Sequence, residues 1–122
     1  MRTSPEKMAT YRATAQQSWA KERRRLVLRR ERAWAVARQA ADLLRGKYGV
    51  DRVTLFGSLV RSELFHTRSD IDLAVWGLDK KHYYRAVAQL LALDAAFEVD
   101  LVMAEEVPGS LLAAIEREGR VL

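Results

Sequence analysis

Two stretches decide the fold of this chain: Leu55-Phe56-Gly57-Ser58, and Ser69-Asp70-Ile71-Asp72-Leu73-Ala74-Val75 eleven residues later. The first is typical of a short apolar strand that runs into a sharp turn at Gly-Ser. The second opens with two alternating aspartates and continues as an apolar strand. We expect the rest of the chain to support these two strands or to be attached to them.

Helices alternate with short strands through the C-terminal part of the chain. The apolar spacing and the turn residues predict strands over 50–56, 71–76 and 97–103, and helices over 58–64, 79–93 and 108–118. Val121-Leu122 is left to pack or to pair with a strand. This alternation predicts a small α/β sheet domain over residues 48–122.

Residues 1–47 predict a long basic helix, or two helices with a frayed joint, that begins at Ser4-Pro5. Gly46 and Gly49 are expected to end it around Tyr48. Seven basic residues between Lys21 and Arg32 interrupt an apolar stripe, so the first half is expected to project from the domain and the second half to lie on it. The stripe runs through Met8, Tyr11, Ala15 and Trp19 and resumes through Leu26, Ala33, Ala37, Ala40 and Leu44.

Composition limits the classes of protein that this chain can be. Its 122 residues suffice for one domain, and the absence of cysteine excludes disulfides and thiolate metal sites. No apolar run is long enough for a membrane span and no secretory signal is visible, so we expect a cytoplasmic protein. The net charge is +9 over residues 1–50 and −4 over residues 51–122. A basic arm of this kind can attract an acidic partner or nucleic acid.

Three aspartates are candidate ligands for a metal ion. Side chains alternate along a strand, so Asp70 and Asp72 are expected on one face, about 6–7 Å apart. Asp100 lies in an otherwise apolar strand, where an ionised carboxylate is costly without a partner. If the third strand lies beside the second, the three carboxylates form a cluster of the kind that holds two Mg²⁺ or Mn²⁺ ions. Taken singly, Asp70 and Asp72 could mark a solvated strand edge, and Asp100 could pair with an arginine.

The Gly57-Ser58 turn is a candidate phosphate site. Glycine lets the backbone approach a ligand closely, and the amides that open the following helix attract phosphate. Ser58 adds a hydroxyl donor, and Arg61 is expected to reach a triphosphate one turn later.

These blocks, together with Phe97-Glu98-Val99-Asp100-Leu101-Val102, resemble the minimal nucleotidyltransferase (MNT) family of the polymerase-β-like superfamily. The resemblance covers roughly residues 45–122. This sequence departs from the usual family pattern in two places. It has Ser62 where the family has glycine, and its interval between Ser58 and Asp70 is one residue longer than the commonest family interval.

The resemblance implies a mixed sheet flanked by helices and the transfer of a nucleoside monophosphate from a nucleoside triphosphate. It implies that Asp70 and Asp72 bind metal, that Asp100 binds the catalytic metal and helps to deprotonate the acceptor, and that Gly57 and Ser58 hold the triphosphate. The expected cofactors are two Mg²⁺ ions, or Mn²⁺, with ATP as the substrate.

The chain has no room for a domain that binds the acceptor, so a partner protein or a homodimer must supply it. Stand-alone MNT proteins of this size resemble antitoxins that transfer AMP to a tyrosine of a HEPN-domain toxin, which leads us to expect such an antitoxin. Two alternatives stay open. The chain could neutralise its partner by docking alone through the long helix, or it could act on RNA or a small molecule.

Overall fold

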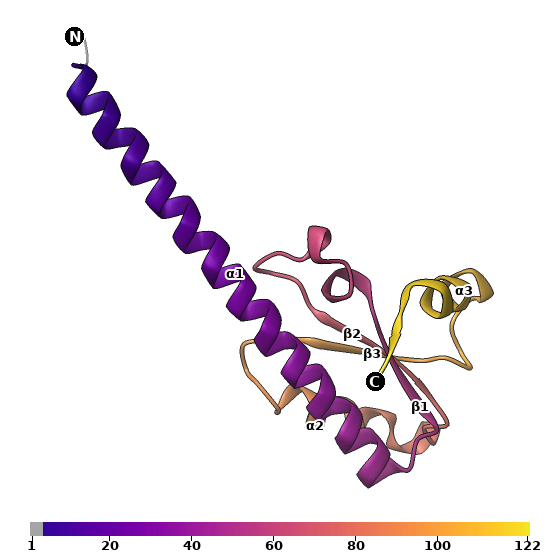
Figure 1. Ribbon diagram of the computed structural model, residues 1–122. Helices are drawn as coiled ribbons and strands as arrows, with labels where there is room; N and C mark the ends of the chain where they lie inside the picture. Colours follow the sequence, from indigo (N-terminus) through magenta and orange to yellow (C-terminus); the bar gives the residue numbers. More distant parts are fainter. Residues whose placement is uncertain (1–3) are drawn as a thin grey trace.

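The computed structural model describes residues 4–122 as a four-stranded sheet, three α-helices and three short 3₁₀ helices (Figure 1). This arrangement confirms the predicted α/β fold with its long N-terminal helix. The order is α1 (Pro5–Tyr48), β1 (Arg52–Phe56), η1 (Gly57–Leu59), η2 (Ser62–Leu64), β2 (Ile71–Trp76), η3 (Lys80–His82), α2 (Tyr83–Leu91), β3 (Val99–Met103), α3 (Gly109–Glu118) and β4 (Arg120–Val121). Of the predicted N-terminal segment 1–47, residues 1–3 lie outside the described part.

Helix α1 is a single continuous helix of 44 residues, about 66 Å long at the usual rise per residue. The Ser4 hydroxyl caps its start by accepting the Lys7 amide at 3.2 Å, and Pro5 occupies the first turn. Gly49 ends it in the left-handed conformation (φ 62°), with its amide donating to the Arg45 carbonyl. Gly46 stays inside the helix, so only the second of the two predicted glycine stops is used. The division of the chain at residue 47 stays a prediction.

The sheet is mixed and has the order β3-β2-β1-β4. Strands β1 and β2 are antiparallel, whereas β2 and β3 are parallel and joined by the crossover that contains α2. Strand β4 adds a short antiparallel edge to β1, with Val121 opposite Thr54. The C-terminal residues therefore pair with the sheet, one of the two outcomes that the sequence left open.

The two faces of the sheet are covered differently. Alternate residues of β1, β2 and β3 enter a buried core with α1 and α2; those of the central strands are Val53, Leu55, Ile71, Leu73 and Val75. The opposite face carries Asp72 and Asp100, and α3 contacts it over β1, where Gly119 lies against Thr54. Asp100 is exposed and Asp72 partly buried, whereas Ala74 farther along β2 is buried. The end of this face that carries the two aspartates is therefore open and can receive a ligand.

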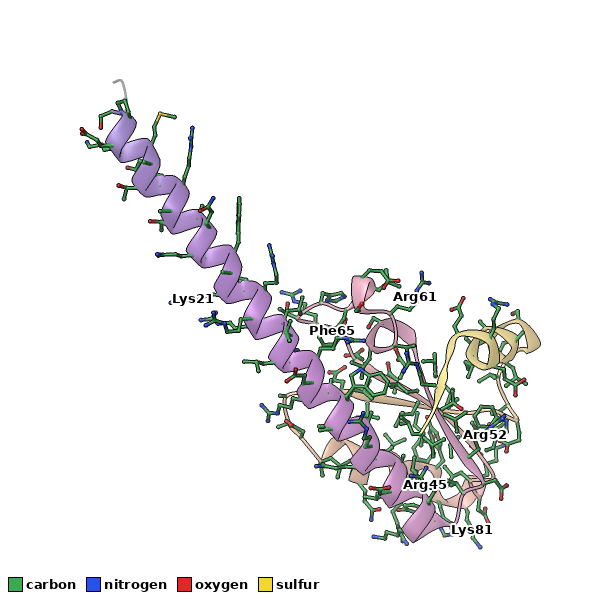
Figure 2. All side chains as sticks on the ribbon, in the orientation of Figure 1. Lys21, Arg45, Arg52, Arg61, Phe65 and Lys81 are labelled. Carbon is green, nitrogen blue, oxygen red and sulfur yellow. The ribbon has the colours of Figure 1, made fainter. Side chains whose placement is uncertain are left out.

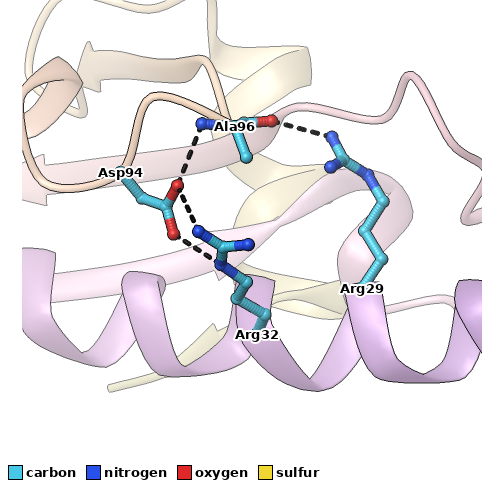
Figure 3. Close-up of polar contacts among 4 residues, drawn as sticks. All are labelled: Arg29, Arg32, Asp94 and Ala96. Carbon is cyan, nitrogen blue, oxygen red and sulfur yellow. Dashed lines mark hydrogen bonds and ion pairs between the residues drawn. The ribbon is translucent and has the colours of Figure 1, made fainter.

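Arginines of α1 fasten the helix to the turn that leads into β3 (Figure 3). Arg32 makes a bidentate contact with the Asp94 carboxylate at 2.7 and 3.0 Å, and Arg29 donates to the Ala96 carbonyl at 3.0 Å. The Arg29 guanidinium also lies 4.3 Å from the centre of the Phe97 ring. The Ala96 amide and then Arg32 lower the pKa of Asp94, which keeps this carboxylate ionised.

The N-terminal half of α1 extends beyond the rest of the molecule (Figures 1 and 2). Residues 5–25, which we call the projecting arm, are exposed except for the partly buried Ala15, and Leu26 is the first residue to pack against the core. Figure 2 shows Lys21 clear of the domain and Arg45 on it. The predicted split between a projecting half and a packed half is confirmed. None of the helices within residues 4–122 combines the length and apolar character that a membrane crossing requires.

Candidate active site

The parallel pairing of β2 and β3 places Asp72 directly opposite Asp100. Residues in register on neighbouring strands point to the same face, so the two carboxylates lie side by side on the open face. Asp70 comes two positions before Asp72, just ahead of the start of β2, and its charge acts on Asp72. The structure thus pairs Asp72 with Asp100 and leaves Asp70 near them, an acidic cluster in which Asp70 and Asp72 are partly buried and Asp100 is exposed.

Gly57 connects this acidic cluster to the turn after β1. Phe56 pairs with Asp72, and Gly57 follows it with a φ of 80°, which L-residues with a side chain rarely adopt. A Cβ atom built at Gly57 would overlap the Asp72 carboxylate. Glycine is thus needed here twice, for the turn and for the close approach of the carboxylate to the backbone.

The segment after Gly57 differs from the expected helix. The chain forms two 3₁₀ turns there, η1 and η2. The Val60 amide donates to the Gly57 carbonyl to close η1, and the Leu64 and Phe65 amides donate to the carbonyls three residues earlier to close η2. A three-residue turn presents fewer aligned amides than a helix, so the helix N-terminus that the sequence predicted for a phosphate is not formed here. Arg30 of α1 supports the turn by donating to the Leu59 carbonyl at 3.1 Å.

A pocket of about 230 Å³ lies beside this turn and is lined by residues of η1, η2 and α3. Gly57, Ser58 and Arg61 all border it, whereas the three aspartates do not. Arg61 is ion-paired with Glu63 at 3.1 Å, and both side chains are more than half exposed. Exposed pairs of this kind are weak, so Arg61 is free to exchange Glu63 for a phosphate. The structure groups the three predicted nucleotide-binding residues on one pocket, next to the acidic cluster.

The loop before Asp70 is held by its own polar side chains. The buried Ser69 hydroxyl accepts the His66 amide at 2.9 Å, while the His66 ring nitrogen Nδ1 accepts the Arg68 amide at 3.1 Å. His66 therefore closes the turn. These bonds orient the segment that delivers Asp70 to β2.

The acidic cluster is electrostatically unfavourable without a cation. Burial, followed by the charges of Asp100 and Asp70, raises the pKa of Asp72 from its ordinary 3.8 to about 6. Mg²⁺ and Mn²⁺ prefer carboxylate oxygens as ligands, so the three aspartates offer the kind of ligand atoms that such an ion requires. Within residues 4–122, however, no three acidic or histidine side chains converge closely enough to surround one ion. Asp72 and Asp100 form the tight pair, and a bound cation would have to draw Asp70 inward.

Some neighbours of the site carry no signal in the sequence. Arg30 looks like one more basic residue of α1, and Leu111 and Ile115 look like ordinary apolar positions of α3. They reach the turn after Gly57 only through tertiary packing. Glu63 was likewise not singled out, although its position two residues after Arg61 made a local ion pair possible.

The raised pKa of Asp72 predicts a specific pH dependence of stability. Since the pKa is higher in the folded state, folding loses free energy as the pH rises from 3.8 through about 6. We expect Asp72→Asn to raise the free energy of unfolding at pH 8 by about 1–2 kcal/mol, after allowance for solvent screening. Urea denaturation at pH 8 and pH 4 checks this, and the difference between variant and wild type should vanish at pH 4. A variant less stable than wild type at pH 8 would contradict it.

Comparison with known proteins agrees with the fold. The model of the family described as "Polymerase beta, Nucleotidyltransferase" matches residues 38–122, and a search of curated proteins found no match. This chain belongs to the polymerase-β nucleotidyltransferase family.

Among solved structures, the chain is similar to one from a toxin–antitoxin complex with AMP-PNP (26% identity, TM-score 0.59, 70% of each chain covered). It is also similar to a candidate minimal nucleotidyltransferase (28% identity, TM-score 0.53, 81% of this chain and 94% of that chain). A structure of the tri-AMPylated Shewanella oneidensis HEPN toxin with its MNT antitoxin shares the fold at 22% identity (TM-score 0.55, 73% and 70% covered). These similarities confirm the resemblance to MNT antitoxins.

Proposed function

We propose that this nucleotidyltransferase transfers AMP from ATP to a hydroxyl group of a HEPN-domain toxin and acts as its antitoxin. The observation that carries the proposal is the pairing of Asp72 with Asp100 next to Gly57, which sets an acidic cluster beside the turn proposed to bind phosphate. The similarity to a chain crystallised in a toxin–antitoxin complex with AMP-PNP supports the nucleotide and the kind of partner.

In the proposed site, Gly57 and Ser58 bind the triphosphate through backbone amides and the serine hydroxyl. Arg61 leaves Glu63 and pairs with a phosphate. Asp70, Asp72 and Asp100 are the residues that would hold Mg²⁺ or Mn²⁺. Such a cation, when bound, supplies positive charge that offsets the negative charge of the triphosphate and of the cluster.

The reaction is a displacement at the α-phosphorus of ATP. The acceptor oxygen forms the new bond to phosphorus, the bond to pyrophosphate breaks, and the hydroxyl proton is taken up by Asp100 or water. Asp100 suits this role because it is exposed on the open face, where an acceptor can approach it. A tyrosine hydroxyl is the acceptor that we propose, because attached AMP adds bulk and negative charge that would repel an RNA substrate from the toxin.

The test is a labelling experiment with purified protein, Mg²⁺ and α-³²P-labelled ATP, and either the cognate HEPN-domain protein or bulk RNA. We expect label on the HEPN-domain protein, located on tyrosine by mass spectrometry, and loss of its toxicity. Label on RNA would instead support a nucleotidyltransferase that acts on RNA. Neutralisation without any label, unchanged in Asp70→Ala, would show that the chain acts by docking alone.

A further inference from the structure

The projecting arm leaves the domain at the end of the sheet that carries the candidate active site. The C-terminus of α1 adjoins the start of β1 and the end of β2, as the Val50–Leu44 and Asp51–Trp76 backbone bonds show. Farther toward its N-terminus, α1 bonds to Leu59 after β1 and to Ala96 before β3. The arm therefore continues past the end at which Gly57, Asp72 and Asp100 lie (Figure 1).

One face of the arm is apolar and has nothing to pack on. Met8, Tyr11 and Trp19 are 45%, 67% and 65% exposed. Successive members of this stripe are three or four positions apart, which places them on one side of a helix. Ala15 is the fourth member of the stripe. The stripe lies on the same side of α1 as the residues that are buried against the sheet, which are Ala33, Ala37, Ala40 and Leu44. A helix laid on the stripe would thus extend the core beyond its active-site end.

The charged residues beside the stripe indicate which kind of helix can bind to it. The arm holds six basic and two acidic residues, and one of the acidic residues, Glu22, is already paired with Arg25 at 3.1 Å. Arg12 and Arg23 lie along one edge of the stripe, four positions after Met8 and Trp19, and Lys7 lies along the other edge, four positions before Tyr11. Two such arms would repel each other, whereas a helix with acidic edges would complement them.

We propose that the projecting arm is a docking site for an amphipathic, acidic-edged helix of the acceptor protein, and that it holds this protein beside the nucleotide site. The inference rests on the proposed function for the identity of the acceptor. It is independent of the family's shared core, because the family match starts at residue 38 and leaves the arm outside. Holding the acceptor raises its effective concentration at the active site.

The first test is a pair of charge-matched double variants in the full chain. Tyr11→Glu with Trp19→Glu alters the stripe, while Thr10→Glu with Gln17→Glu adds the same charge on the opposite side of the arm. Aromatic residues dominate binding energy at protein interfaces, so we expect the stripe variant to weaken binding to the cognate HEPN-domain protein about tenfold or more. The KM for that protein should rise with it, and the control pair should leave both unchanged. All four positions are exposed, so circular dichroism is expected to show both variants folded.

The second test concerns charge. Arg12→Ala with Arg23→Ala removes two cations beside the stripe, and Lys21→Ala with Arg24→Ala removes two from the opposite side. The first pair should slow association and reduce its dependence on salt, and the second should not. Equal effects of the two pairs would overturn the proposed site.

Three further results would overturn the proposal: wild-type binding by the stripe variant, a homodimer of the chain alone that the stripe variant dissolves, or loss of the complex on nuclease treatment. Failure of the proposed function would give a different experimental result from failure of the docking site. In that case no AMP would be transferred, yet binding of the HEPN-domain protein would still depend on Tyr11 and Trp19. Transfer that proceeds equally well in the stripe variant would refute the docking site alone.

Discussion

Replacing Asp100 with asparagine is expected to lower the rate of AMP transfer by about 10²–10³-fold. Asparagine keeps the size of the side chain but removes the negative charge that would attract a cation and accept the proton of the acceptor. Because Asp100 is exposed and raises the pKa of Asp72, the same substitution should not destabilise the fold. The measurement is the initial rate of label transfer from ATP at saturating HEPN-domain protein, with a thermal melt of each variant.

Asp42 offers a matched control for this substitution. It is exposed on α1 and paired with Arg45 at 3.1 Å, far along the chain from the open face. Asp42→Asn makes the same chemical change and should keep the wild-type rate. An Asp100→Asn protein that melts like wild type and transfers AMP at the wild-type rate would remove Asp100 from the mechanism. Of the three aspartates predicted to bind metal, Asp70 and Asp72 would then remain.

Replacing Gly57 with alanine is expected to damage both the fold and the site. The positive φ alone costs about 1 kcal/mol for an L-residue. The new methyl group would also meet the Asp72 carboxylate, so the free energy of unfolding should fall by about 2 kcal/mol or more in total. Since the turn and the carboxylate are displaced together, binding of an ATP analogue should weaken as well.

Gly46 provides the opposite expectation from the same substitution. It lies within α1, and a Cβ atom there would meet no other atom within 4 Å. Gly46→Ala should therefore raise the free energy of unfolding by about 0.5–1 kcal/mol. Urea denaturation of the two variants side by side checks the pair. A Gly57→Ala protein as stable as wild type would show that the turn does not need its left-handed residue.

The strands and helices follow largely from local patterns in the chain. The apolar runs that end at Gly57 and begin at Ile71 predict β1 and β2, and both are found. Strand β1 starts at Arg52 and β3 at Val99, two residues later than expected, because strand ends depend on where a partner pairs. The helix expected over 79–93 begins instead with a 3₁₀ turn that Asp79 caps, and α2 follows at Tyr83.

The candidate site was only partly predictable, because its parts come from distant segments. The alternation of Asp70 and Asp72 follows from strand geometry, and the glycine of the turn is readable from the sequence. That Asp100 stands opposite Asp72 required β3 to be parallel to β2 and in one particular register, which no local pattern specifies. The support of the turn by Arg30 was likewise beyond local patterns, because Arg30 and Leu59 are 29 residues apart in the chain.

The sequence by itself determined which residues are candidates for the site and which helix is long and basic, since hydrophobic spacing, glycine and charge act over a few neighbouring residues. Only the tertiary structure decided how these parts meet. The parallel crossover brought Asp100 to Asp72, the turn at Gly57 placed the candidate phosphate site against them, and the packing of Ala33–Leu44 directed the arm past the end of the sheet that carries the candidate site. These outcomes depend on long-range packing and strand register, because contacts between distant segments form only when the whole core closes.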